Sequence, residues 1–226
     1  LDDVTFRVFP NEIVGLLGDN GAGKSTLIKV LSGAERLTSG EIFIKGKKVD
    51  IKTPRDAMLQ GMGFVPEDRK LQGLVLGMSV GKNTTLAALK AVANKAGFIN
   101  HKQEKEMADK FVKALEVKTP SNDQLVKNLS GGNQQKVVIA KWLANNPDIL
   151  ILDEPTRGID VGAKKEIHQL MSDLANQGVA IIMISSELPE VLGMSDRVVV
   201  MHEGRIKGEL DRSEADQVSI MKMAVS

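Results

Sequence analysis

The fold is decided by the stretch Gly18-Asp19-Asn20-Gly21-Ala22-Gly23-Lys24-Ser25, which lies near the start of this 226-residue chain. It matches the pattern G-x-x-x-x-G-K-[ST], a loop that surrounds phosphate groups. Glycines let backbone N–H groups turn toward phosphate oxygens, where a Cβ would clash. Residues 13–17 before the loop are apolar like a buried strand, and residues 24–31 after it have a helical pattern. A strand-loop-helix arrangement is the context that the motif requires.

The residues of this loop have separate predicted roles. Lys24 is expected to reach the β- and γ-phosphates of a nucleotide, and the Ser25 hydroxyl to ligate Mg²⁺. The helix that follows points its positive end at the anion. We predict that the nucleotide-binding residues are Gly18, Asp19, Asn20, Gly21, Ala22, Gly23, Lys24, Ser25 and Thr26.

Short apolar runs alternate with helical patterns along the chain, which favours βα units and a largely parallel sheet. Residues 149–152 and 180–184 are almost wholly apolar, as strands buried on both faces should be. Residues 4–8 alternate like a half-exposed strand, and Lys45-Gly46-Lys47 predicts a hairpin turn. Between about 67 and 146 only helical periodicity appears. We predict one α/β domain over residues 1–226, with a core (1–66 and 147–226), an N-terminal antiparallel β portion and an inserted helical subdomain (67–146).

Composition narrows the classes of function. The formal net charge is +1, with 30 basic and 29 acidic residues, so we expect no nucleic-acid partner. The chain has no cysteine, which excludes disulfides and thiolate metal sites. No apolar run approaches the roughly 18 residues of a membrane-spanning helix. The chain begins at Leu1 with a strand-like segment, which leads us to expect residues upstream.

Two carboxylates, Asp153 and Glu154, follow the apolar run at residues 149–152. In a parallel sheet, ligands gather at the carboxyl ends of strands. Asp153 is therefore expected to hold Mg²⁺ with Ser25, directly or through water. Glu154 is expected to polarise an attacking water molecule.

A second glycine-containing motif, Leu129-Ser130-Gly131-Gly132-Asn133-Gln134-Gln135, precedes a helical pattern. It resembles the LSGGQ signature of ABC ATPases, and the three motifs occur in the order of that family. The resemblance implies a P-loop NTPase core that binds ATP and Mg²⁺. It also implies that the signature faces the nucleotide of a second cassette, and that Gly158 and Asp160 lie in the loop between cassettes. The predicted signature residues are Ser130, Gly131, Gly132, Asn133 and Gln134.

The resemblance covers nearly the whole chain and has two parts. Residues 64–70, 73–80, 153–164 and 185–191 are similar to the second cassette of bacterial monosaccharide importers of the ribose, galactose and xylose type. Residues 18–31 instead resemble the first cassette, or single-cassette sugar importers, because the second cassette often has Arg in place of the loop lysine. Recombination, engineering or an unusual single-cassette subunit would each explain this combination.

Besides the phosphate loop, the sequence departs from the family pattern at three further places. Glu67 stands where most ABC ATPases have Gln, and Ser186 stands where most have His. The family's adenine-stacking aromatic precedes the segment at Val4, so adenine recognition is unassigned. The resemblance implies that the catalytic residues are Glu154, Lys24 and Ser186, and that the metal ligands are Ser25, Asp153 and Glu67.

The resemblance implies that ATP binding and hydrolysis drive sugar import through a membrane permease. The expected partners are a second ABC cassette, permease subunits that contact residues 67–80, and indirectly a sugar-binding protein. The expected location is peripheral, on the cytoplasmic face of the bacterial inner membrane. The alternative is a regulatory cassette that binds ATP with little or no hydrolysis, which Glu67, Ser186 and the missing adenine platform motivate. Soluble ABC ATPases of translation or DNA repair are disfavoured, because their linkers, coiled coils and basic stretches do not occur here.

Overall fold

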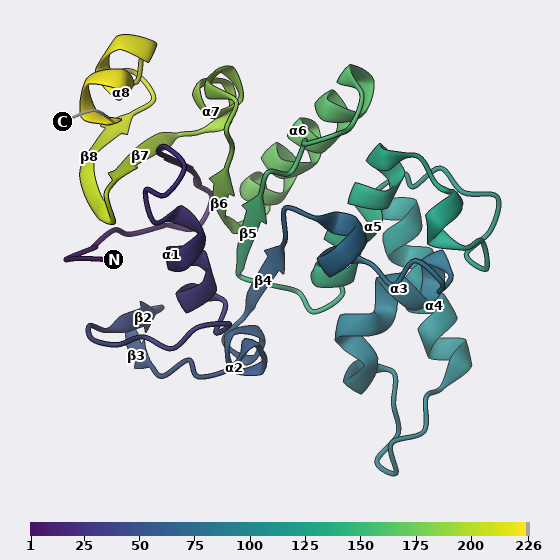
Figure 1. Cartoon of the computed structure of the whole chain (residues 1–226). Coiled ribbons are helices and arrows are strands. Elements are labelled where there is room, and N and C mark those ends of the chain that lie inside the picture. Colours follow the sequence, from purple (N-terminus) through teal and green to yellow (C-terminus); the bar gives the residue numbers. More distant parts are fainter. Residues whose placement is uncertain (225–226) are drawn as a thin grey trace. The chain divides into compact units, whose positions relative to one another are not determined.

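The computed structural model describes residues 1–224, which form two compact units (Figure 1). Among the described residues, the first unit contains residues 1–64, 147–154 and 171–224, and the second contains residues 65–146 and 155–170. The second unit therefore also takes in residues 155–170, which the sequence assigned to the core. The predicted organisation as one domain with a helical subdomain at 67–146 stays a prediction.

A six-stranded sheet dominates the first unit, in the order β4-β5-β6-β1-β7-β8. The pairs β5–β6, β6–β1 and β1–β7 are parallel, whereas β7–β8 is antiparallel. Parallel strands covered on both faces read as continuous apolar runs, which is why the central strands were recognisable in the sequence. The strands are β1 (Ile13–Leu17), β4 (Met62–Val65), β5 (Ile149–Asp153), β6 (Ala180–Ile184), β7 (Arg197–His202) and β8 (Arg205–Asp211).

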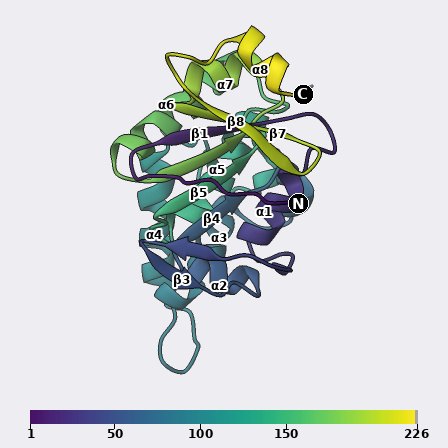
Figure 2. The ribbon, with the colours of Figure 1, turned by 90° about the vertical axis from the view of Figure 1, so that its left-hand side faces the viewer.

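Helices α1 (Lys24–Leu31) and α7 (Leu188–Met194) cover opposite faces of this sheet (Figure 2). Leu27 and Ile28 of α1 pack with Leu16 of β1 in one buried cluster. On the other face, a Cβ at Gly15 would lie 2.7 Å from Val191 of α7, so only glycine permits this approach. Helix α8 (Gln217–Ala224) packs on β7 and β8.

A small antiparallel hairpin, β2 (Ile42–Ile44) and β3 (Lys47–Val49), also belongs to the first unit. Its turn confirms the hairpin expected around Lys45-Gly46, since both residues have positive φ as a two-residue hairpin turn requires. Helix α2 (Pro54–Leu59) follows, with Thr53 as N-cap in a capping box with Asp56.

Residues 4–8 were expected to form a strand, and this expectation is wrong. The alternation of exposure is present, because Val4, Phe6 and Val8 pack against the core cluster while the residues between them are exposed. The described backbone there has no neighbouring strand with which to form a ladder, so the segment is extended without belonging to a sheet.

The second unit is helical within its described residues. Helix α3 packs against α4 and α5, and the core between them contains Val80, Ala108, Val137 and Val138. Residues 80–91, within the stretch expected to be helical, form two consecutive helical segments, and a kink lies at Ala88 in the second. The elements are a π-turn η1 (Arg69–Gly73), α3 (Val80–Thr85), a 3₁₀ segment η2 (Leu86–Ala91), α4 (His101–Ala114), η3 (Val126–Asn128) and α5 (Gly131–Leu143).

Helix α6 (Val161–Asn176) begins in the second unit and ends in the first. No helix within residues 1–224 combines the length and apolar character that crossing a membrane would need.

Candidate nucleotide-binding site

The loop between β1 and α1 requires glycine at two positions for different reasons. A Cβ at Gly18 would lie 2.3 Å from the carbonyl oxygen of Met201, so no side chain fits there. Gly23 has φ of 102° and forms the left-handed N-cap of α1. This backbone places the start of α1 directly after the loop, where helix N–H groups can face an anion. Asp19, Asn20, Ser25 and Thr26 are exposed around it.

The Lys24 ammonium lies across this loop. Its Nζ donates hydrogen bonds to the carbonyl oxygens of Gly18 and, at 3.0 Å, Asp19. Burial lowers the pKa of Lys24, and the negative charges of Glu154, Asp19 and Asp153 oppose that shift. The lysine therefore places its cation where the loop and the two carboxylates meet, as its predicted role in phosphate binding requires.

Asp153 ends β5 at the carboxyl edge of the sheet, level with Ile184 at the end of β6. Burial, together with the negative charge of Glu154, raises the pKa of Asp153 to about 6, and the positive charge of Lys24 acts in the opposite direction. A carboxylate in this position carries a desolvation cost that a nearby cation would relieve.

Glu154 follows with a left-handed backbone, φ of 48°, which is uncommon for a residue with a side chain. Its N–H donates to the carbonyl oxygen of Ile184 at 2.9 Å, which anchors the residue at the sheet edge. The Ser186 hydroxyl donates to Glu154 Oε2 at 3.2 Å. Burial raises the pKa of Glu154, and the hydrogen bonds from Ser186 act in the opposite direction. The structure thus brings Ser186 to the carboxylate of Glu154.

The oxygen donors of this unit fit a magnesium ion. Ser25 offers an exposed hydroxyl and Asp153 a half-buried carboxylate, and Mg²⁺ prefers such hard oxygen ligands. Within residues 1–224, no three acidic or histidine side chains gather as a ready metal site. An ion here would depend on nucleotide phosphates and water for its remaining ligands, as Mg²⁺ commonly does.

The signature residues lie in the second unit, at the start of α5. Ser130 is the N-cap of α5, and its Oγ accepts a hydrogen bond from Asn133 Nδ2 at 2.9 Å. Asn133 Oδ1 in turn accepts from the Lys118 N–H at 2.7 Å. Gln134 is buried and donates to the carbonyl oxygen of Val126 at 3.2 Å. Asn133 and Gln134 therefore fix the first turn of α5, while Ser130 is exposed.

The two signature glycines are required by close packing. A Cβ at Gly132 would lie 2.4 Å from the Cβ of Ala163 in α6. A Cβ at Gly131 would lie 2.9 Å from Arg69 Nη2 and 3.2 Å from the Gly158 carbonyl oxygen. The predicted loop residue Gly158 therefore lies next to the signature. Asp160 accepts a hydrogen bond from the Ala163 N–H at 2.9 Å, at the start of α6.

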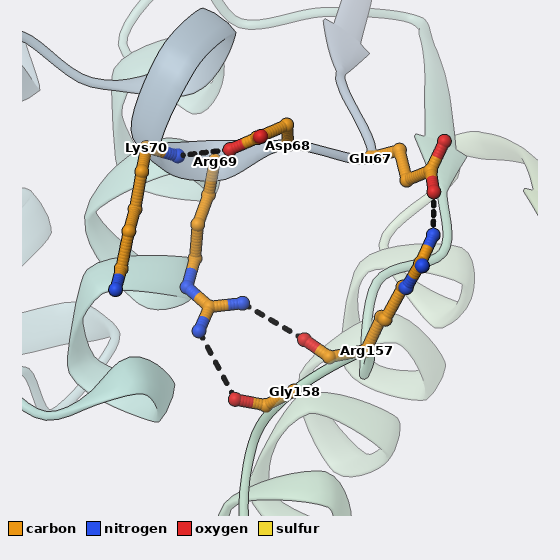
Figure 3. Close-up of a pocket in the computed structure, with 6 residues that line it drawn as sticks. All are labelled: Glu67, Asp68, Arg69, Lys70, Arg157 and Gly158. Atoms are coloured by element: carbon orange, nitrogen blue, oxygen red, sulfur yellow. Dashed lines mark hydrogen bonds and ion pairs between the residues drawn. The ribbon is translucent and has the colours of Figure 1, made fainter.

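A pocket of about 310 Å³ lies beside these residues (Figure 3). The Glu67 carboxylate forms an ion pair with Arg157 across it. That pairing compensates the negative charge of Glu67. The residues that line the pocket are Glu67, Asp68, Arg69, Lys70, Arg157 and Gly158.

Sequence reasoning gave no role to Arg69 or Arg157, although both lie in the motif-like strings at residues 64–70 and 153–164. The partners of these two arginines are distant in the sequence, so no spacing between sequence neighbours could have predicted this pocket. Glu67 belongs to the second unit, whereas Ser25 and Asp153 belong to the first. Its role as a metal ligand stays a prediction.

Comparison with known proteins identifies the family. A family model described as ABC transporter matches residues 1–157. The ribose import ATP-binding protein RbsA of Bacillus subtilis is 53% identical over 223 residues, which are 99% of this chain and 45% of that protein. A putative ribose/galactose/methyl galactoside import ATP-binding protein of Rhizobium etli is 54% identical over 223 residues, 99% of this chain and 42% of that protein. The chain spans less than half the length of these curated relatives.

A solved structure shares the fold. A bacterial ABC transporter cassette determined as a dimer superimposes with a TM-score of 0.75 and 25% sequence identity. The match covers 92% of this chain and 89% of that one. The expected fold class, a P-loop core with a mostly parallel sheet, an antiparallel β portion and helices, is confirmed.

Proposed function

Because the chain belongs to the ABC transporter family, we propose that it binds and hydrolyses ATP to drive the import of a sugar through a membrane permease. The observation that carries the proposal is the gathering of Lys24, Asp153 and Glu154 at the carboxyl edge of the sheet, beside the glycine loop. The names of the curated relatives support sugar as the cargo. A ribose importer and a putative ribose/galactose/methyl galactoside importer match this chain at 53% and 54% identity, so the similarity does not single out one sugar.

In the proposed mechanism, the loop holds the phosphates of ATP. The N–H groups at the start of α1 face the phosphate oxygens, and Lys24 exchanges its carbonyl partners for the β- and γ-phosphates. The ammonium is already partly desolvated and held at the loop, so it needs little reorganisation. Ser25 and Asp153 would hold Mg²⁺, which neutralises charge on the phosphates.

Glu154 is the proposed group that orients the attacking water molecule. Its burial raises its pKa, which makes the carboxylate a better proton acceptor. The hydrogen bond from Ser186 fixes the direction of Oε2. We therefore assign Ser186 a positioning role on Glu154.

A second cassette completes the proposed site. The exposed Ser130 and the N–H groups of Gly131 and Gly132 lie at the start of α5, where they can face an anion. The dimeric form of the related bacterial cassette supports this arrangement. The permease and the sugar-binding protein are proposed further partners, and the proposed location is peripheral at the cytoplasmic face of the inner membrane.

Transport assays in vesicles that contain the assembled importer test this proposal. Lys24→Ala should abolish ATP binding and sugar uptake, because the loop loses its cation. Glu154→Gln should retain ATP binding but lower ATP turnover about 100-fold or more, because the water molecule loses its proton acceptor. Binding is measured with a fluorescent ATP analogue, turnover by phosphate release and uptake with radiolabelled sugar.

Lys29→Ala and Glu35→Gln are matched controls. They remove an exposed ion pair that begins on the same helix, and should leave uptake unchanged. Undiminished sugar uptake with either Lys24→Ala or Glu154→Gln would refute the mechanism. A wild-type turnover no higher than that of Glu154→Gln would favour the regulatory cassette instead.

A further inference from the structure

Arg69 joins segments of the second unit that are far apart in the sequence. Its Nη1 donates to the Arg157 carbonyl oxygen at 2.8 Å, and its Nη2 donates to the Gly158 carbonyl oxygen at 3.0 Å (Figure 3). Both acceptors belong to the loop that leads into α6. One planar guanidinium therefore binds two successive carbonyl groups, a geometry that a lysine could not reproduce.

The same guanidinium lies against the signature. The space that a side chain at position 131 would need is taken by Arg69 Nη2 on one side and the Gly158 carbonyl oxygen on the other. Gly131 therefore lets the first turn of α5 approach both the arginine and the loop. One side chain therefore contacts both the loop and the signature.

Arg69 extends from a turn that is held at both ends. Asp68 Oδ1 accepts hydrogen bonds from the N–H groups of Lys70 and Leu71, at 2.9 and 3.0 Å. At the other end, the buried Lys141 donates from Nζ to the Gly73 carbonyl oxygen at 2.5 Å. The ion pair between Glu67 and Arg157 adds a second link between the turn and the loop. Because the backbone of this turn is held at both ends, the Arg69 side chain can keep the groups that it contacts in a fixed position.

We propose that Arg69 is a positioning residue that fixes the loop at residues 157–160 against the signature helix. The role rests on the proposed function, in which the signature completes the nucleotide site of a second cassette. Arg69 acts through the backbone of Arg157 and Gly158 and through its contact with Gly131. ATP binding by the phosphate loop does not depend on it.

Arg69→Met tests the role, because methionine retains a long side chain without the donors. The purified protein should show at least a tenfold lower kcat for ATP, with KM for ATP within twofold of wild type. Amide hydrogen exchange should accelerate at residues 158–160 and 130–132. Lys105→Met in α4 is the control, since Lys105 is exposed and, within residues 1–224, the structure shows no hydrogen bond or ion pair from its ammonium. It should leave kcat and exchange within twofold of wild type.

A double variant tests the contact with Gly131. Gly131→Ala should lower kcat strongly in the wild-type background and at least threefold less in an Arg69→Ala background, because the collision with Nη2 is absent there. If Gly131→Ala lowers kcat by the same factor in both backgrounds, the inferred contact between Arg69 and position 131 is wrong.

Three further outcomes have defined meanings. Unchanged kcat and exchange in Arg69→Met would overturn the positioning role. Equal acceleration of exchange in α4 would also overturn it, because the variant would then have loosened the whole unit. A wild-type protein without ATP turnover would refute the proposed function, and the exchange measurements would still decide whether Arg69 holds the loop.

Discussion

The buried position of Asp153 disfavours the ionised form of its carboxyl group. Burial raises its pKa to about 6, and the neighbouring Glu154 acts in the same direction. A carboxyl group whose pKa is raised on folding stabilises the protein fully below its unfolded value, near 3.8. That contribution is lost as the pH rises through about 6. The ionised Asp153 is thus a cost to the fold that magnesium binding would offset.

Asp153→Asn should therefore raise the free energy of unfolding at pH 7.5 by about 1–3 kcal/mol in the absence of nucleotide, given about 1.4 kcal/mol per pKa unit and partial exposure. The gain should shrink toward zero near pH 4, where the wild-type carboxyl is protonated. Urea unfolding at both pH values measures it. Asp50→Asn, at an exposed ion pair, is the control and should change stability by less than about 0.5 kcal/mol. A pH-independent gain, or a loss at pH 7.5, would contradict the account.

At the scale of elements, the contact between α5 and α6 explains one glycine of the signature. Gly132 brings the first turn of α5 against Ala163. Farther along both helices, the buried Lys136 pairs with Glu166 at 2.8 Å. The glycine is therefore explained by helix packing, whatever the signature binds.

Gly132→Ala should destabilise the protein by about 1–3 kcal/mol, because the new Cβ would lie 2.4 Å from the Cβ of Ala163. Gly193→Ala in α7 is the opposite control. A Cβ there meets no described atom within 4 Å, so the substitution should be neutral or stabilise by up to about 1 kcal/mol. Chemical unfolding of the two variants compares them directly. Equal stability of the two would show that the helices separate without cost.

At the scale of the whole molecule, the proposed site takes its phosphate loop from one cassette and its signature from another. Lys24→Ala and Ser130→Arg should each be inactive alone. Mixing equal amounts should restore about a quarter of wild-type turnover if chains pair at random. Half of the pairs are then mixed, and each mixed pair has one intact site.

Phosphate release from the mixture measures this restoration. Two preparations of the same variant, mixed in the same way, are the control and should stay inactive. A mixture no more active than its parts would exclude a site shared between two copies of this chain.

Much of the central sheet could be predicted residue by residue. Strands 13–17 and 180–184 were predicted with the observed bounds, because strands buried on both faces leave uninterrupted apolar runs. The start of α2 at Thr53-Pro54 depends on neighbouring residues only, because capping is a local interaction. Residues 4–8 failed for the converse reason: alternation reports which side chains are buried, whereas a strand also needs a neighbour.

The sequence by itself determined that the chain has a phosphate loop, an acidic strand end and a glycine signature, because each is a contiguous motif whose chemistry is local. Only the tertiary structure decided what surrounds them. Ser186 bonds to Glu154, Glu67 pairs with Arg157, and Arg69 holds the loop before α6. These partners are separated by 32 to 90 positions, and no local rule of spacing brings such residues together. Their contacts follow from strand order and helix packing, which the chain acquires only when it folds.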